Sequence, residues 1–161
     1  MSTAFLFNGS NVLLMKKQFS RLSDTPFWSG LGGHLEPDEL NAPLKACYRK
    51  IYEESGLLES DIVGLRLRYI LLRNKDNEIR QQFVYFGETT TLDFTSSDEG
   101  ELFWVNKDAM HELHMSRIIR FMLEHFHDNT DKKEIVIGVI SIDENENPII
   151  QWSDILDPKT F

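Results

Sequence analysis

Apolar residues come in short runs along this chain, and polar, turn-forming residues separate the runs. Residues 5–7 and 12–15 are apolar on either side of Asn8-Gly9-Ser10-Asn11, an arrangement that predicts two strands joined by a turn. Longer runs over residues 62–73 and 79–88 flank the polar residues 74–77 and predict a second pair of strands. A short strand is predicted over residues 102–105, and a final hairpin over residues 134–142 and 148–152.

Two stretches have the periodicity of helices instead. Apolar residues at positions 118, 119, 122, 123 and 126 predict a packing helix within residues 115–126. Another helix is predicted over residues 41–55, with Asn41 as its N-cap, Pro43 in its first turn and Gly56 as its C-terminal stop. Residues 16–26 are polar and predict a loop. Strands with helices distributed among them predict an α/β fold in which a sheet packs between helices.

Length and composition indicate one domain over residues 1–161, with 41% hydrophobic and 27% charged residues. The formal net charge of −9 argues against long nucleic acid as a partner, although a cation could bridge the protein to a small phosphorylated ligand. The single cysteine, Cys47, excludes an intramolecular disulfide and a cysteine zinc site. The sequence has neither a signal peptide nor an apolar run of about 20 residues, so we expect a cytoplasmic protein without a membrane partner.

The helix predicted over residues 41–55 carries the most informative side chains. On a helical wheel one side holds Leu44, Cys47, Tyr48 and Ile51, and the opposite side holds Arg49, Lys50, Glu53 and Glu54. The apolar side can dock on a sheet, and the other side then offers two adjacent carboxylates. Arg49 and Glu53 are i,i+4 neighbours, so the arginine can orient that carboxylate through a charged hydrogen bond.

Oxygen ligands for a metal ion are concentrated around this helix. Glu39 precedes it, and the backbone carbonyls of Gly32 and Gly33 lie within reach because glycine allows close approach. Together with Glu53 and Glu54 they form a hard-oxygen site suited to Mg²⁺ or Mn²⁺, in which the metal ligands are Glu53, Glu54, Glu39 and Gly33. A solvated helix face would also account for the two adjacent glutamates alone.

A longer pattern runs through this region: Gly33, five intervening residues, Glu39, and then Arg49, Ile51, Glu53, Glu54, Gly56 and Leu57. It resembles the Nudix box, which runs Gly, five residues, Glu, seven residues, Arg-Glu, a large aliphatic residue, any residue, Glu-Glu, any residue, Gly and an aliphatic residue. The preceding stretch Trp28-Ser29-Gly30-Leu31-Gly32-Gly33 is also similar to the family. The resemblance implies a Nudix-type α/β/α sandwich with a mixed sheet between helices.

The same resemblance implies a MutT-like hydrolase that cleaves the diphosphate of a nucleoside diphosphate derivative or of an oxidised nucleoside triphosphate. Glu53 and Glu54 would hold the metal and Arg49 would orient them. The stretch Asp98-Glu99-Gly100-Glu101-Leu102-Phe103-Trp104-Val105 resembles a downstream acidic turn of the family that supplies a further metal ligand or the catalytic base. Glu99 is preferred over Glu101 for that role, and a solvated turn is the alternative interpretation.

Substrate contacts are expected from Gly32, Gly33 and Trp28, whose ring can either stack on a base or belong to the core. Arg66, Arg68 and Arg73 lie on the polar side of a strand. They could meet substrate phosphate, contact a second subunit of a homodimer, or cover a solvated sheet face.

The chain departs from the family pattern at two places. Nine residues separate Glu39 from Arg49, two more than usual, and the loop before the helix can absorb them. Lys50 stands where the family has a metal-binding glutamate, and an ammonium group cannot bind a cation. Lys50 can also pair with Glu54 at i,i+4. Three hypotheses follow: the remaining carboxylates still hold metal, activity is slow or needs high metal, or the domain binds a nucleotide or a partner without hydrolysis.

Overall fold

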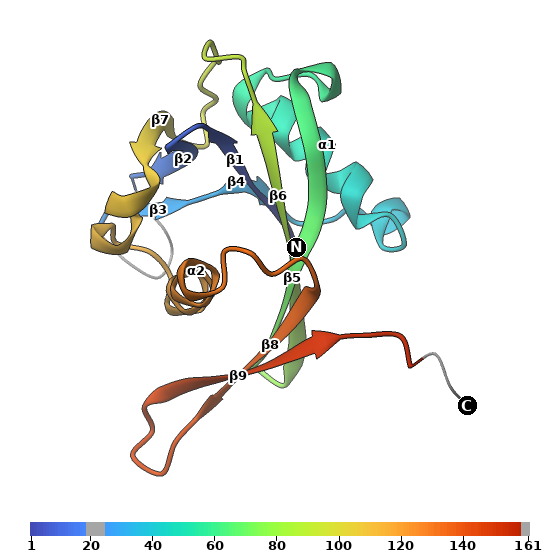
Figure 1. The fold of residues 1–161 in the computed structure, drawn as a ribbon, viewed down its shortest axis with the longest axis vertical. Helices are drawn as coiled ribbons and strands as arrows, with labels where there is room; N and C mark the ends of the chain where they lie inside the picture. Colours follow the sequence, from blue (N-terminus) through green and yellow to red (C-terminus); the bar gives the residue numbers. More distant parts are fainter. Residues whose placement is uncertain (19–24, 159–161) are drawn as a thin grey trace.

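The computed structural model describes residues 1–18 and 25–158, and the described residues form a single nine-stranded sheet (Figure 1). Its strands are β1 (Ser2–Asn8), β2 (Asn11–Lys17), β3 (Phe27–Ser29), β4 (Leu31–Gly33), β5 (Ile62–Lys75), β6 (Glu78–Thr89), β7 (Glu101–Asn106), β8 (Ile135–Ile142) and β9 (Pro148–Ile155). The helices are α1 (Pro43–Ser55) and α2 (Arg117–Asp128), with short 3₁₀ turns η1 (Pro37–Glu39), η2 (Glu59–Asp61) and η3 (Lys107–Glu112).

The first strand of the chain lies in the interior of this sheet. The order is β3-β2-β1-β6-β5-β8-β9, while β4 pairs with β1 and β7 pairs with β2. The pairs β1–β6 and β5–β8 are parallel and the other pairs are antiparallel, so the sheet is mixed.

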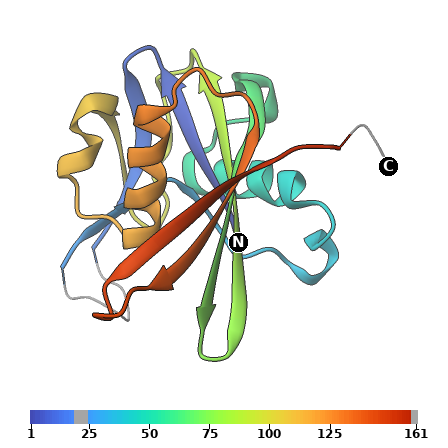
Figure 2. The same cartoon turned by 60° about the horizontal axis from the view of Figure 1, so that its bottom comes forward.

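Helices α1 and α2 lie on opposite sides of the sheet (Figures 1 and 2). Successive side chains of a strand point to opposite faces, and β1 divides its residues accordingly. Phe5 belongs to the core cluster covered by α2, whereas Leu6 belongs to the cluster that contains Cys47 and Ile51 of α1. The predicted α/β/α sandwich is therefore confirmed.

The predicted hairpins are confirmed with small changes in length. β2 extends through Lys17, so the loop predicted over residues 16–26 begins later, and its residues 19–24 lie outside the described part of the chain. Between β5 and β6, Asp76 and Asn77 have positive φ angles of 57° and 60°, which makes a two-residue turn whose twist matches that of the strands.

The start of the first helix was predicted incorrectly. α1 begins at Pro43 and its N-cap is Ala42, which makes no side-chain capping bond, so Asn41 is not the cap. Proline suits the first position because its φ angle is already helical and the N–H that it lacks would have no partner within the helix. The predicted stop is confirmed, because Gly56 has a left-handed φ of 73° and donates its N–H to the Tyr52 carbonyl at 2.8 Å.

Strands β3 and β4 were not predicted. Each has three residues, and their partners β2 and β1 come from earlier in the sequence, so local periodicity carries no signal for them. None of the helices in the described part of the chain has the length and apolar character needed to cross a lipid bilayer.

Candidate functional site

Helix α1 contributes the central carboxylates, but on two different faces. Glu53 is exposed, whereas Glu54 is fully buried beside Cys47 and Ile51. The predicted wheel placed Glu54 on the open side, and this was wrong: Glu54 follows Cys47 by two helical turns and therefore shares its face. The Gly32 N–H donates to Glu54 Oε2 at 2.7 Å, so this carboxylate joins α1 to β4. Leu44, predicted on the docking side, is 40% exposed.

Gly32 is required where it stands. Its φ of 152° is rare for other residues, and a Cβ there would overlap the Ser2 carbonyl oxygen of the neighbouring strand β1. Because β4 can approach β1 this closely only with glycine at this position, Gly32 also determines where the N–H that donates to Glu54 lies.

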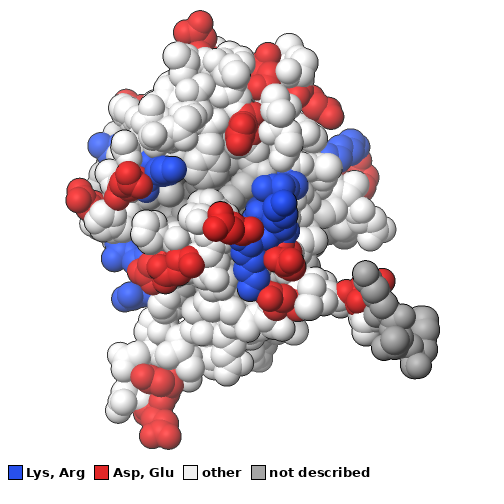
Figure 3. All heavy atoms as spheres, in the orientation of Figure 1, with Lys and Arg blue, Asp and Glu red and all other residues white. Residues whose placement is uncertain are grey.

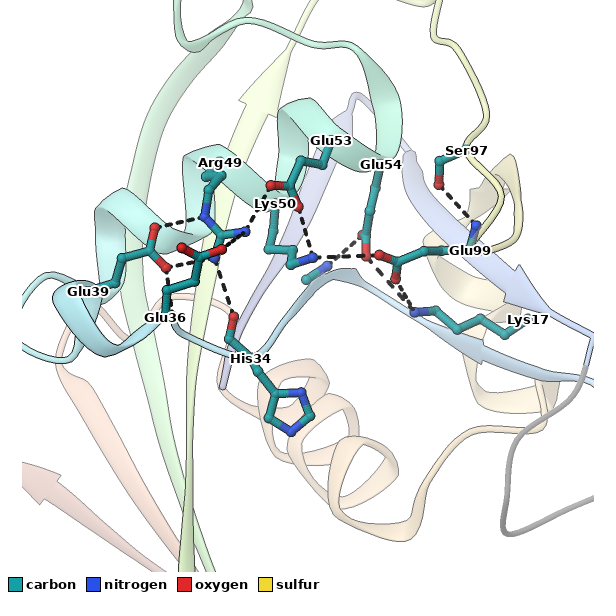
Figure 4. Close-up of polar contacts among 11 residues, drawn as sticks. Lys17, His34, Glu36, Glu39, Arg49, Lys50, Glu53, Glu54, Ser97 and Glu99 are labelled. Atoms are coloured by element: carbon teal, nitrogen blue, oxygen red, sulfur yellow. Dashed lines mark hydrogen bonds and ion pairs between the residues drawn. The ribbon is translucent and has the colours of Figure 1, made fainter.

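Arg49 joins two of the predicted carboxylates (Figure 4). Its Nε and Nη2 donate to the two oxygens of Glu39 at 2.7 and 2.6 Å, and its Nη1 donates to Glu53 Oε1 at 2.9 Å. The Glu36 N–H donates to Glu39 Oε2 at 3.0 Å as well. These hydrogen bonds, from Arg49 first and Glu36 second, lower the pKa of the buried Glu39 to about 2. Both carboxylate oxygens of Glu39 therefore accept hydrogen bonds from Arg49 and connect η1 to α1.

Lys50 points into the group of carboxylates. Its Nζ lies 2.8 Å from Glu53 Oε2 and 3.5 Å from Glu99 Oε1, so its ion pairs join Glu53 and Glu99 instead of the predicted i,i+4 partner, Glu54. A hydrogen bond to Glu53 raises the pKa of Lys50. The side chain runs over Gly33, where an added Cβ would lie 2.8 Å from Lys50 Cε.

A second lysine, Lys17, was missed by the sequence analysis. Its Nζ lies 3.3 Å from Glu99 Oε2 and 3.9 Å from Glu54 Oε1. The alternation along β2 contained the signal: Leu13 and Met15 belong to the core that α1 covers, and Lys17 is the next residue on that side.

Glu54 and Glu99 influence each other's ionisation. Burial raises the pKa of Glu54 to about 7, and the neighbouring Glu99 carboxylate adds to this increase. Partial burial alone would raise the pKa of Glu99 too, but Lys17, with smaller contributions from Glu54 and Lys50, lowers that pKa below its usual value. Glu54 Oε1 is buried and has no hydrogen-bond partner among the described residues.

The carboxylate–lysine cluster is the name we give to Lys17, Lys50, Glu53, Glu54 and Glu99. Glu99, the preferred loop candidate, belongs to it, whereas Glu101 is exposed at the start of β7 opposite Lys16. Within residues 1–18 and 25–158 no three His, Cys, Asp or Glu side chains are already arranged to hold a metal ion. The cluster pairs oxygen ligands with ammonium groups, so it offers groups for both a cation and phosphate oxygens.

Trp28, the third predicted substrate contact, packs with the core that α2 covers. Its ring lies 5.5 Å from that of Phe103, its backbone N–H donates to the His114 carbonyl at 2.8 Å, and the Lys16 ammonium lies 5.8 Å from the ring centroid. The residue is partly exposed.

Comparison with known proteins assigns this arrangement to a described family. A family model described as NUDIX domain matches residues 2–147. No curated protein sequence matches the chain significantly.

Solved structures are similar to the chain over most of its length. A mutator MutT protein from Bacillus halodurans is 20% identical with a TM-score of 0.67, covering 98% of this chain and 97% of that chain. A MutT protein from Methanosarcina mazei Go1 is 20% identical with a TM-score of 0.66, covering 81% and 94%. A C. elegans Ap4A hydrolase is 14% identical with a TM-score of 0.62, also covering 81% and 94%. At these identities the similarity shows a common fold.

Proposed function

The chain belongs to the NUDIX domain family, and we propose that it is a hydrolase that cleaves the diphosphate of a small nucleotide. The substrate is a nucleoside diphosphate derivative or an oxidised nucleoside triphosphate, and residues 1–161 act as one domain. The observation that carries the proposal is the buried Glu54 near the end of α1, held by the Gly32 N–H and coupled in its ionisation to the exposed Glu99.

A divalent cation, Mg²⁺ or Mn²⁺, fits the residues of the cluster. Glu54 Oε1 is a buried oxygen without a hydrogen-bond partner among the described residues, and Glu99 supplies a second carboxylate beside it. Glu53 and the Gly33 carbonyl are the further ligands that we propose, while Glu39 acts through Arg49. When bound, such a cation neutralises diphosphate charge and activates water for attack.

The chain's own residues prepare the site for this reaction. Arg49 fixes Glu53 by a charge-assisted hydrogen bond and is itself fixed by Glu39, so the carboxylate is held before the substrate arrives. Glu99 is the group that we propose as proton acceptor for the attacking water. Lys17 and Lys50 can turn their ammonium groups to phosphate oxygens, and Gly32 and Trp28 are our candidates for further substrate contacts.

One observation favours a second function, a NUDIX domain that binds a nucleotide or a partner protein without hydrolysing it. The Lys50 ammonium pairs with Glu53 and Glu99, and its stem covers Gly33. In this position it satisfies carboxylates that would otherwise attract a cation.

The deciding experiment measures product formation from nucleoside triphosphates, oxidised nucleotides, ADP-ribose and dinucleoside polyphosphates with Mg²⁺ or Mn²⁺, resolved by chromatography. Glu54→Gln removes the proposed ligand, Lys50→Glu introduces the usual family residue, and Glu101→Gln is the matched control outside the cluster. For a hydrolase we expect turnover by the native protein, a loss of at least about 100-fold in Glu54→Gln, and no change in Glu101→Gln.

The opposite result would identify the binding domain. A native protein that is inert toward the whole panel, while Lys50→Glu gains turnover, would reject hydrolysis by this chain and assign the loss to Lys50. Retained activity in Glu54→Gln would instead reject the proposed metal ligand.

A further inference from the structure

A large hollow lies on the side of the sheet away from α1. It has a volume of about 950 Å³ and is bounded by α2, η3, the beginning of β5 and the end of β6. Of the described residues that line it, none belongs to the carboxylate–lysine cluster. We call it the α2 hollow, and its lining is separate from the residues proposed for hydrolysis.

The wall of the α2 hollow includes three aromatic rings from three elements. Phe7 of β1, Phe86 of β6 and Phe126 of α2 line it. Phe86 packs edge-on against Phe7 and Phe126, with ring centroids 5.5 and 4.6 Å apart. A wall of this kind favours a ligand with a flat apolar body, and the volume suits one of ordinary small-molecule size.

One buried charge lines the same hollow. A solvated sheet face was one interpretation of Arg68 from the sequence, but its side chain is buried and the residue is only 4% exposed. Its Nη2 donates to the Lys132 carbonyl, and its Nε has no hydrogen-bond partner among the described residues. Within residues 1–18 and 25–158 it forms no ion pair, and Glu134 is the carboxylate whose charge acts on it from a greater distance.

An unpaired buried guanidinium is costly because the protein interior solvates charge poorly. Burial lowers the pKa of Arg68 and the positive charge of the neighbouring Arg66 adds to the decrease, while Tyr69 and Glu134 offset it only in part. An anion in the hollow would offset both effects by a charge-assisted, two-oxygen contact of the kind that guanidinium favours.

The charged residues at the rim determine which anion fits. Acidic and basic side chains both line the hollow: Glu88, Asp108, Glu124 and Asp128 on one hand, and Arg66, Lys107 and Arg120 on the other. Figure 3 shows a column of Lys and Arg side chains near the centre of one face with Asp and Glu side chains on both sides. A phosphate dianion would meet four rim carboxylates, whereas a single negative charge aimed at Arg68 meets less repulsion.

We propose that the α2 hollow is a second binding site, for a small organic monocarboxylate whose aromatic body packs on Phe7, Phe86 and Phe126 and whose carboxylate pairs with Arg68. The carboxylate supplies an ion-pair partner, which the buried guanidinium lacks among the described residues because its one hydrogen bond there goes to the Lys132 carbonyl. This ligand class differs from the polyanionic nucleotide proposed for the carboxylate–lysine cluster.

The test uses three probes of one shape: 2-naphthoate, the neutral 2-naphthamide, and 2-naphthyl phosphate. Calorimetry gives each affinity, and amide chemical shifts locate the binding. We expect naphthoate to bind about 10-fold or more tightly than naphthamide and naphthyl phosphate, with shifts around Gly64, Gly87 and Phe126. Arg68→Met should remove the preference over the amide, and Arg66→Met, its exposed neighbour, should keep it.

A second variant leaves the guanidinium intact. Val63 is exposed and lines the hollow, so Val63→Trp fills part of the space and should weaken naphthoate and naphthamide alike. Equal affinity of the native protein for naphthoate and naphthamide would overturn the proposal. Tighter binding of naphthyl phosphate would overturn the preference for a single negative charge. Chemical shift changes confined to α1 would overturn the location, because the ligand would then occupy the proposed nucleotide site.

Discussion

At the scale of single residues, we expect the charge at position 50 to control the affinity of the proposed site for a cation. Lys50 holds Glu53 at 2.8 Å and Glu99 at 3.5 Å, so a cation must displace an ammonium group before it can reach either carboxylate. Lys50→Met removes that competitor, and Lys50→Glu changes the local charge by two units. We expect the affinity for Mn²⁺ to rise about 10-fold in Lys50→Met and further in Lys50→Glu, measured by electron paramagnetic resonance of free Mn²⁺.

Lys45→Met provides the matched control, since Lys45 lies on the same helix and its one ion pair among the described residues is with the exposed Asp38 at 3.7 Å. Its Mn²⁺ affinity should equal that of the native protein. If Lys50→Met also leaves the affinity unchanged, the ammonium group does not compete with the metal.

The pair of Glu39 and Arg49 makes stability depend on pH. Hydrogen bonds from Arg49 lower the pKa of Glu39 to about 2 from an ordinary 4.5, so the folded state binds this proton less readily than the unfolded state does. The stabilisation is therefore complete above pH 4.5 and is lost as the pH falls toward 2. We expect Glu39→Gln to lower the melting temperature by several degrees at pH 7 and to converge with the native protein near pH 2.

Thermal melts monitored by circular dichroism at a series of pH values test this. Glu36→Gln is the control, because Glu36 is exposed and lies 3.7 Å from Arg49. A loss in Glu39→Gln that is the same at pH 7 and pH 2.5 would mean that the ion pair is not its source.

Single residues also show which contacts of the site can be predicted from the sequence. The contact of Arg49 with Glu53 follows from i,i+4 spacing and was predicted. The burial of Glu54 follows from the same geometry but was missed, because the helical wheel grouped Glu54 with Glu53 and not with Cys47, two turns before it. The contact between Lys17 and Glu99 joins β2 to a loop before β7, and spacing within one element cannot reveal it.

At the scale of elements, the end of α1 depends on one backbone conformation. Gly56 has a φ of 73°, and a Cβ there would meet Thr95 only at an ordinary 3.6 Å. The cost of a side chain at this position is therefore backbone strain and not a clash. Gly56→Ala should reduce the free energy of unfolding by about 1–2 kcal/mol in urea titrations.

Gly56→Asn separates strain from volume. Asparagine adopts the left-handed conformation more readily than alanine, so we expect its loss to be smaller although its side chain is larger. A greater loss in Gly56→Asn than in Gly56→Ala would show that space near Thr95 matters more than backbone strain.

In the turn between β5 and β6, introducing a glycine should stabilise the fold. Asp76 and Asn77 both have positive φ, and the second position of such a turn favours glycine. We predict that Asn77→Gly raises the free energy of unfolding by about 0.5 kcal/mol, seen as a higher urea midpoint with an unchanged slope. An unchanged or lower midpoint would show that asparagine already fits the turn as well as glycine.

Elements with strong local signals were the ones predicted correctly. The hairpin turns, the stop at Gly56 and the apolar stripe of α2 are all encoded within a few residues of where they act. A sheet packed between helices followed from the distribution of strands and helices, but the mixed sheet followed from resemblance to a family, because no local pattern indicates that β1 pairs in parallel with β6 or β5 with β8.

At the scale of the whole molecule, the reactivity of the Cys47 thiol measures whether α1 is packed against the sheet. Its side chain is fully buried beneath the helix, and burial raises the pKa of the thiol to about 12. The single thiol of the chain should therefore react with a disulfide reagent at least about 100-fold more slowly in the folded protein than in guanidinium chloride. Ser60→Cys in a Cys47→Ser background gives the rate of an exposed thiol. Fast labelling of Cys47 with an unchanged circular dichroism spectrum would mean that α1 opens without global unfolding.

The parallel pairing of β1 with β6 also governs the order in which a growing polypeptide can fold. Residues 2–7 align with residues 83–88, so β1 meets this partner only after α1 and β5 have already been synthesised. Tyr85 of β6 shares the core beneath α1 with Leu6 and Ile51, so the helix that carries Glu53 and Glu54 has an incomplete surface to dock on until then. A nascent chain stalled near residue 77 consequently exposes the edge of β1 and an uncovered apolar layer. An unpaired strand edge and an uncovered apolar surface are the features that make such an intermediate prone to aggregation.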